Sequence, residues 1–298
     1  MILRVSFIAA SALLVAACGG SAPSPEPPDL VLARSQRVAV AAFQQGQIDQ
    51  AARLAESALV HAYARDDAAA IADISYNLAV IALRLGRPEA ALAAARSARG
   101  DAERRGGSVL PELMLVEAAA LYRLGQRTEA AAVAHLVGTV AADAATTDRA
   151  RFIQGLVAAD DGDTVRLAQA IAFLADRTAG VPVADLEELR GRQATLAGDH
   201  GSAFSAALAA ADLRREERDY AGMARALATA AAAAESLGND AAAAQLYLRA
   251  GRSAAAQGAS ADAVRWLDAA TRASRAAGQP EVEGEAERHR ILPADQSL

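Results

Sequence analysis

Residues 76–91 of this 298-residue chain read YNLAVIALRLGRPEAA. Apolar side chains recur every three or four residues as far as Leu85, as they do on one face of an α-helix. Gly86 ends this pattern, and Pro88 stands where the first turn of a new helix tolerates a missing amide proton. The stretch therefore predicts a helical hairpin, with two helices joined by a tight turn at the glycine.

The same turn signal recurs along the chain, as a glycine followed five residues later by an alanine. Gly162 keeps the rhythm but has Leu167 in the alanine position. Intervals of about 20 or about 40 residues between such glycines are typical of stacked helical hairpins. A stacked array offers a groove rather than a sealed pocket, which favours binding over chemistry. The pairs are Gly46/Ala51, Gly86/Ala91, Gly125/Ala130, Gly198/Ala203, Gly238/Ala243 and Gly258/Ala263.

The rest of the composition agrees with an all-α fold. Alanine, the best helix former, makes up about 28% of the residues, and aromatic residues only 4%. A GC-rich coding genome is an alternative explanation for the alanine, since every basic residue is arginine. The predicted helices span 30–45, 48–64, 68–85, 88–104, 109–124, 127–142, 147–160, 163–178, 183–197, 200–214, 218–237, 240–257 and 260–277, with a polar tail helix near 280–290.

These hairpins resemble tetratricopeptide (TPR) repeats. In that family a leucine and a small residue lie in the first helix, a glycine closes it, and Glu-Ala opens the second. The matching positions are Leu78, Ala79, Gly86, Ala91 and Ala98, and then Ala118, Gly125 and Ala130 one repeat later. The family's tryptophan and helix-ending proline are missing, and the spacing of 36–40 residues exceeds the usual 34.

The resemblance covers about residues 33–278 and implies an α-α superhelix of six to seven hairpins. Gly155, Gly191 and Gly251 take the small-residue position, where helices are expected to cross most closely. A different α-α solenoid or a plain helical bundle is the alternative. We divide the mature chain into a solenoid over 30–278 and a polar tail or capping helix over 279–298.

Residues 1–17 are expected to be a signal peptide, with Arg4 as its positive charge and an apolar stretch too short to span a bilayer. The stretch ends in Val15-Ala16-Ala17-Cys18, which resembles the bacterial lipoprotein lipobox. The resemblance implies lipidation at Cys18, the only cysteine of the chain. Residues 18–29 then form a Pro-rich tether, and Gly19 after the cysteine implies the outer membrane. An ordinary secretory signal with a chance cysteine is the alternative.

Other kinds of chemistry find little support in the sequence. The net charge of −6 is spread along every segment, which argues against nucleic-acid binding. The run Asp160-Asp161-Gly162-Asp163 lacks the twelfth-position glutamate of a calcium loop, so we interpret it as a turn with an N-cap. The four histidines lie in separate segments, and neither a phosphate-binding loop nor a nucleophile motif occurs. We expect no enzyme activity, cofactor or metal.

The first helix of each hairpin should line the concave face, with Arg149, Asp185 and Glu188 among the inward positions. Five residues there are our candidates for binding a protein or peptide partner: Tyr76, Val80, Arg84, Phe152 and Arg192. Aromatic and arginine side chains are enriched at binding hot spots. The terminal hairpins, mostly alanine, should offer little to grip. We expect a membrane-anchored scaffold in envelope assembly, facing the periplasm; the alternative is a periplasmic ligand-responsive sensor or solute-binding module.

The lipid anchor can be tested by replacing its cysteine. Two or three acyl chains give stable membrane attachment where one is marginal, so wild-type protein should sediment with membranes and Cys18→Ser should become soluble. Cell fractionation followed by immunoblotting measures this. If both proteins are soluble, the chain carries no lipid anchor.

Overall fold

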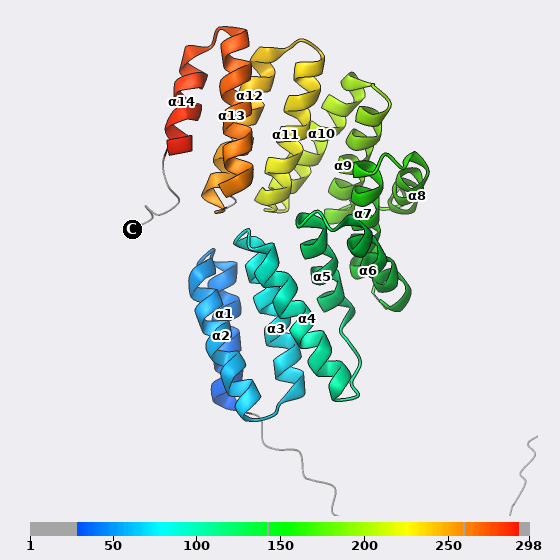
Figure 1. Cartoon of the computed structure of the whole chain (residues 1–298), viewed down its shortest axis with the longest axis vertical. Coiled ribbons are helices and arrows are strands. Elements are labelled where there is room, and N and C mark those ends of the chain that lie inside the picture. Colours follow the sequence, from blue (N-terminus) through cyan, green and yellow to red (C-terminus); the bar gives the residue numbers. More distant parts are fainter. Residues whose placement is uncertain (1–28, 142, 259, 292–298) are drawn as a thin grey trace, which may run out of the picture.

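The computed structural model describes residues 29–141, 143–258 and 260–291, which form fourteen helices and no strand. An all-α superhelix is thereby confirmed. Figure 1 shows the helices in chain order. Their bounds are α1 (Leu30–Gln44), α2 (Ile48–Ala64), α3 (Ala68–Arg84), α4 (Pro88–Arg104), α5 (Pro111–Arg123), α6 (Arg127–Val140), α7 (Ala144–Asp160), α8 (Thr164–Leu174), α9 (Val181–Leu196), α10 (His200–Glu216), α11 (Tyr220–Ser236), α12 (Asp240–Ala256), α13 (Ser260–Ala277) and α14 (Pro280–Ile291).

A 20-residue unit, a helix of about 17 residues plus a three-residue turn, builds most of the array. The middle turn residue is left-handed: Gly86, for example, has a φ of 67°. Its amide donates to Leu83 O at 3.2 Å and the next amide, of Arg87, donates to Ala82 O at 2.9 Å. This pair of bonds is the Schellman motif, which satisfies the last carbonyls of a helix. The glycine rhythm of the sequence is thus a rhythm of helix ends.

The array curves, because its odd-numbered helices pack more closely than its even-numbered ones. Direct contacts join α3 to α5, α5 to α7, α7 to α9 and α9 to α11, whereas α12 and α14 are the even pair in comparable contact. Helices on the inside of a bend are closer together, so the odd-numbered helices from α3 to α11, each the first of its hairpin, line the concave face. We call this the concave face throughout.

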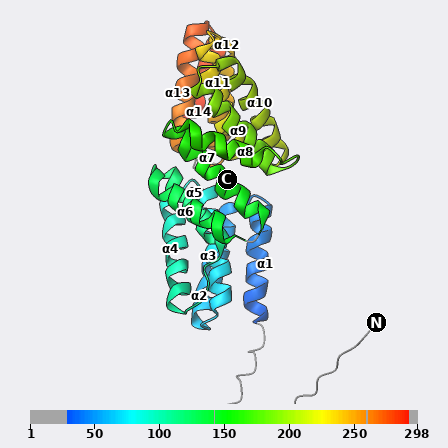
Figure 2. The same ribbon diagram turned by 90° about the vertical axis from the view of Figure 1, so that its right-hand side faces the viewer.

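The bend brings the two ends of the array toward each other. In Figures 1 and 2, α1–α4 form one group, α9–α14 another, and α5–α8 lie between them. The turn between α3 and α4 approaches the turn between α12 and α13: Leu85 O lies 4.0 Å from where a Cβ on Gly258 would be. The two groups therefore approach each other at these turns.

Small residues allow this close packing. A Cβ on Gly155 would lie 2.5 Å from Leu189, and one on Gly251 would lie 2.6 Å from Leu267, so helices cross there at the distance that only glycine permits. At Gly191 the nearest atom would be 3.5 Å away, an ordinary contact. The expected close crossings are confirmed at two of the three glycines. Trp266 belongs to the buried core of α10–α14.

Several predicted helix boundaries were wrong by two to four residues, and three of them show the cause. Helix α5 begins at Pro111 rather than at 109, because a residue before proline disfavours helical dihedrals and Leu110 is extended. Helix α9 begins at Val181, since Gly180 with φ 76° serves as its N-cap. Helix α8 ends at Leu174 rather than 178, where the bidentate bond from Arg177 to Asp148 fixes the following turn.

The signal peptide, Cys18 and most of the tether lie outside the described residues. Within them, Asp29 caps α1 by accepting from Val31 N at 2.8 Å and Leu32 N at 3.1 Å. At the other end, α14 packs against α13 and α12. No helix in the part of the chain that the structure describes is long and apolar enough to cross a membrane.

Arg218 offers a test of the turn geometry. It occupies the left-handed turn position with φ 56°, where every side chain except glycine is strained. Arg218→Gly should raise the free energy of unfolding by about 1 kcal/mol. Arg215→Gly, three residues earlier inside α10, should lower it by about 1 kcal/mol. Thermal melts followed by circular dichroism measure both, and a destabilised Arg218→Gly would contradict the turn assignment.

Candidate binding groove

The predicted binding residues fall into two groups on the concave face. Tyr76, Val80 and Arg84 lie on α3, beside α1 and α5. Phe152 on α7 and Arg192 on α9 lie further along the array, within a dense set of ion pairs. Each group has its own surroundings and is described separately.

The ion pairs centre on Arg214, whose side chain is only 1% exposed. One of its nitrogens donates to Asp185 Oδ1 and to Glu188 Oε2, both at 2.7 Å, and another donates to Asp219 Oδ2 at 2.9 Å. A buried charge is tolerated only when it is paired in this way. Arg214 thus ties α9 and α10 to the residue that caps α11.

Two further arginines complete what we call the Arg214 cluster: Arg149, Asp185, Glu188, Arg214 and Arg225. Arg149 reaches from α7 and donates to both oxygens of Asp185, at 2.6 and 2.8 Å. Arg225 reaches from α11 and binds Glu188 through two nitrogens, at 2.7 and 3.0 Å. The cluster therefore connects four helices, three of which line the concave face.

The arginines determine the charge state of Glu188. Burial alone would raise its pKa, but Arg225, Arg214 and Arg192 together hold the pKa well below its ordinary value. The carboxylate is therefore ionised at neutral pH and contributes stability above the ordinary glutamate pKa. That contribution is lost only as the pH falls toward the lowered value.

Phe152 is buried, with 2% of its surface exposed. Its ring lies 5.1 Å from the Arg149 guanidinium and 5.3 Å from that of Arg214. Such cation–π contacts hold an arginine in place while leaving its hydrogen bonds free for carboxylates. In this structure Phe152 therefore packs beneath the cluster and offers little surface to a partner.

Arg192 lies at the accessible edge of the cluster, with 18% of its side chain exposed. It donates to Asp160 Oδ1 at 2.6 Å, and the hydroxyl of Tyr122 donates to the other oxygen of Asp160 at 2.8 Å. Burial raises the pKa of Tyr122 to about 12, so the phenol keeps its proton. These three residues form a polar surface on the concave face.

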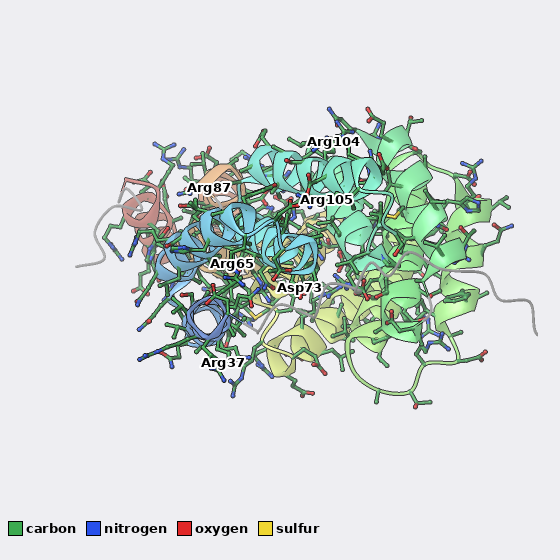
Figure 3. The ribbon with its side chains drawn as sticks, turned by 90° about the horizontal axis from the view of Figure 1, so that it is seen from below. Arg37, Arg65, Asp73, Arg87, Arg104 and Arg105 are labelled. Atoms are coloured by element: carbon green, nitrogen blue, oxygen red, sulfur yellow. The ribbon has the colours of Figure 1, made fainter. Side chains whose placement is uncertain are left out.

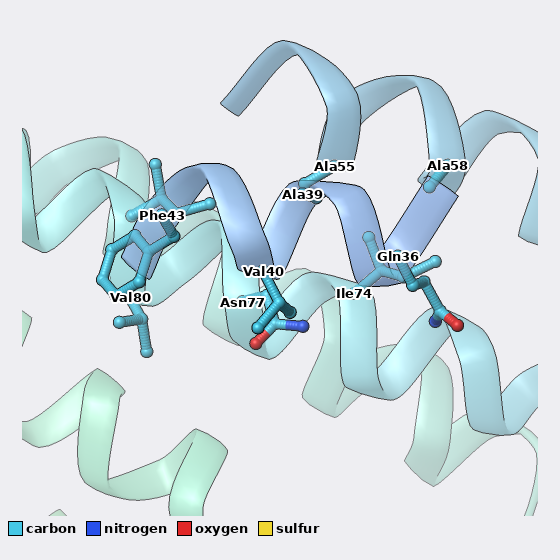
Figure 4. Close-up of a pocket in the computed structure, with 10 residues that line it drawn as sticks. Gln36, Ala39, Val40, Phe43, Ala55, Ala58, Ile74, Asn77 and Val80 are labelled. Carbon is cyan, nitrogen blue, oxygen red and sulfur yellow. The ribbon is translucent and has the colours of Figure 1, made fainter. Parts of the chain in front are cut away.

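Of the predicted residues on α3, Val80 lines a pocket between α1 and α3, which is shown in Figure 4. Phe43 and Val80 lie together at one end, Val40 and Asn77 in the middle, and Gln36 at the other end. The cavity measures about 70 Å³. We call it the α1–α3 pocket. Its lining residues are Gln36, Ala39, Val40, Phe43, Ala55, Ala58, Ile74, Asn77, Val80 and Ile81.

This pocket corrects our expectation that the terminal hairpins offer little to grip. The pocket exists because three of its lining residues, Ala39, Ala55 and Ala58, are too small to fill the space between α1 and α3. Val40 remains 40% exposed at the opening. The alanine-rich composition of the outer hairpin therefore creates an apolar recess there.

Sequence reasoning placed Arg149, Asp185 and Glu188 on the concave face but missed Arg214 and Arg225. Arg214 belongs to the second helix of its hairpin, where inward contacts are not expected. Arg225 could have been found, because one repeat separates the paired residues. Glu188 and Arg225 are 37 positions apart, and Arg149 and Asp185 are 36.

The acidic run at 160–163 is a turn, as interpreted from the sequence. Asp163 caps α8 by accepting from Arg166 N at 2.9 Å, Gly162 has φ 72°, and Asp161 binds Arg127 at 2.6 Å. Across the described residues, no group of three or more potential ligands is placed to hold a metal ion.

Comparison with known proteins shows the class of fold. No protein-family model matches the sequence, and no curated protein gives a significant match. Among solved structures, a tetratricopeptide repeat protein from Parabacteroides merdae shares 14% identity over 86% of this chain and 98% of its own, with a TM-score of 0.51. A Rap protein complexed with competence and sporulation factor shares 13% over 88% and 76%, with a TM-score of 0.59. The chain is thus a TPR-like α-solenoid.

Gly222 provides a test of the Arg214 cluster. A Cβ there would clash with Cδ of Arg214 and lie 2.7 Å from its Nε, and the buried arginine has no room to withdraw. Gly222→Ala should lower the free energy of unfolding by about 1–3 kcal/mol, the usual cost of overpacking. Chemical denaturation followed by circular dichroism measures the change.

Gly201→Ala is the matched control, also in the first turn of a helix. Its Cβ would meet nothing closer than 3.7 Å, so it should raise the free energy of unfolding by about 0.5–1 kcal/mol. Equal effects of the two substitutions would show that Arg214 is not held as described.

Proposed function

We propose that this protein is a non-enzymatic scaffold or adaptor that binds a peptide segment of a protein partner on its concave face. The observation that carries the proposal is the concave face itself, which presents the apolar α1–α3 pocket and accessible polar side chains such as Arg84 and Arg192. Peptide grooves combine apolar contacts for affinity with polar groups that fix orientation.

The rigidity of the array supports a binding role. The Arg214 cluster joins α7, α9, α10 and α11 by short charged hydrogen bonds, which fix the curvature of this part of the face. A preformed surface binds a flexible peptide at lower entropic cost than one that must first order itself. The Rap protein of similar fold, whose structure is a complex with competence and sporulation factor, is a precedent for binding by such a fold.

The size of the α1–α3 pocket favours a peptide over the alternative of a small-molecule sensor. Sites for whole small molecules measure roughly 300–1,000 Å³. A cavity of about 70 Å³ suits a single aliphatic side chain instead. The pocket is therefore the size of one anchor residue in a longer ligand.

The proposed location is the outer membrane, facing the periplasm, where the scaffold would serve envelope assembly. This part of the proposal rests on the lipobox-like Val15-Ala16-Ala17-Cys18 and the Pro-rich tether that follows it. An extended tether of this length reaches about 30 Å from the membrane, at about 3.1 Å per residue. That reach would leave the concave face clear of the lipid surface.

Pull-down from an envelope extract tests the binding face. Tyr76→Ala and Arg84→Glu should each weaken binding of a cross-linked partner on the order of thirtyfold, equivalent to about 2 kcal/mol for one hot spot. Quantitative mass spectrometry of the captured proteins measures the loss, and far-ultraviolet circular dichroism verifies that helicity is unchanged.

The control is Arg166→Glu, the same charge reversal on α8, where the side chain is 79% exposed and contacts Asp163, the N-cap of that helix. It should capture as much partner as the wild type. Retention by the Tyr76 and Arg84 variants, with loss by the Arg166 variant, would place the binding face on the outer side.

A further inference from the structure

The α1–α3 pocket ends beside an arginine. Phe43 and Val80 close the pocket at one end (Figure 4), and the Arg84 guanidinium lies 6.0 Å from the centre of the Phe43 ring. Arg84 is exposed, and it follows Val80 by one helical turn. An occupant that leaves the pocket at this end therefore meets a positive charge immediately.

A second arginine, Arg123 at the end of α5, lies beside the first. Its NH1 donates to Leu83 O at 2.6 Å, which holds the guanidinium against the last turn of α3, where Arg84 is. Burial lowers the pKa of Arg123, and repulsion from Arg225 and Arg84 lowers it further, although solvent still reaches the side chain. Positive charges are thus gathered on the concave face.

These two arginines differ from several others of the same hairpins. Of the arginines labelled in Figure 3, Arg65, Arg104 and Arg105 each have a carboxylate partner. Arg104 and Arg105 bind Asp101 at 3.2 and 2.9 Å, and Arg65 lies 3.5 Å from Asp29. Among the described residues, neither Arg84 nor Arg123 has a carboxylate within 4 Å.

The acids nearest to Arg123 already have partners. Asp219 and Asp262 attract Arg123 across the concave face, but Asp219 binds Arg214 at 2.9 Å and Asp262 binds Arg265 at 2.8 Å. The third arginine in the group, Arg225, is occupied by Glu188. Two guanidinium groups therefore remain with hydrogen-bond donors available to an incoming anion.

We propose that Arg84 and Arg123 bind a carboxylate of the peptide whose aliphatic side chain fills the α1–α3 pocket, so that the partner carries an acidic residue close to an aliphatic one. This inference rests on the proposed function and specifies its ligand. Guanidinium and carboxylate form strong charge-assisted hydrogen bonds. The apolar recess and the paired donors act together on one segment.

The geometry sets the spacing within that segment. From Asn77 in the middle of the pocket to Arg84 is seven helical residues, or about 10 Å along α3. An extended peptide advances about 3.3 Å per residue, so the acidic residue should be about three positions from the aliphatic one.

Selection from a random library of displayed 12-residue peptides, with the purified full chain as bait, tests the proposal. Wild-type protein should enrich Asp or Glu two to four positions from Leu, Ile or Val. Arg84→Gln/Arg123→Gln should keep the aliphatic preference and lose the acidic one. Arg166→Gln, on the outer face, should select as the wild type does.

Fluorescence anisotropy on the most enriched peptide gives a readout that needs no change to the protein. Replacing its acidic residue by the amide should weaken binding to wild-type protein about tenfold or more, and should have no further effect on the double arginine variant. Acidic enrichment that is absent, or that persists in the double variant, overturns this inference alone. Failure to enrich any peptide overturns the proposed function as well.

Discussion

The buried guanidinium of Arg214 is the interaction on which the concave face depends. It is 1% exposed and binds Asp185 and Glu188, each at 2.7 Å. Removal of one partner from a buried ion pair typically costs about 3–5 kcal/mol, because the remaining charge is left without compensation. The helices that contribute these residues are therefore held in one arrangement, which fixes the curvature that a ligand meets.

The rest of the array relies on a weaker but repeated constraint. Alanine and glycine bring the helices close together, and a left-handed residue ends most helices at intervals of about 20 residues. Each contact is small, so stability is spread along the stack, as expected for repeat proteins. The same small residues leave the α1–α3 pocket open. The high content of small residues therefore explains both the close packing where helices cross and the recess between α1 and α3.

Local signals made the fold predictable from the sequence. Helical periodicity, Gly86-type turns and caps such as Asp199, which accepts from Ser202 N at 3.0 Å, act over a few residues and can be recognised there. The concave face was predicted from the repeat register. What could not be predicted depends on long side chains that cross between helices: Arg214 reaches inward from a second helix, and Phe152 is buried because two guanidinium groups cover its ring. The lipid anchor remains a prediction.

Site-specific photo-cross-linking tests most directly the central claim, that the concave face binds the partner. A photoreactive phenylalanine derivative would replace Val80, at the end of the α1–α3 pocket, and separately Val165, which is 66% exposed on α8. The account predicts a covalent adduct with the partner from position 80 and none from position 165, with the cross-linked partner peptide identified by mass spectrometry. An adduct from position 165 and none from position 80 would contradict it.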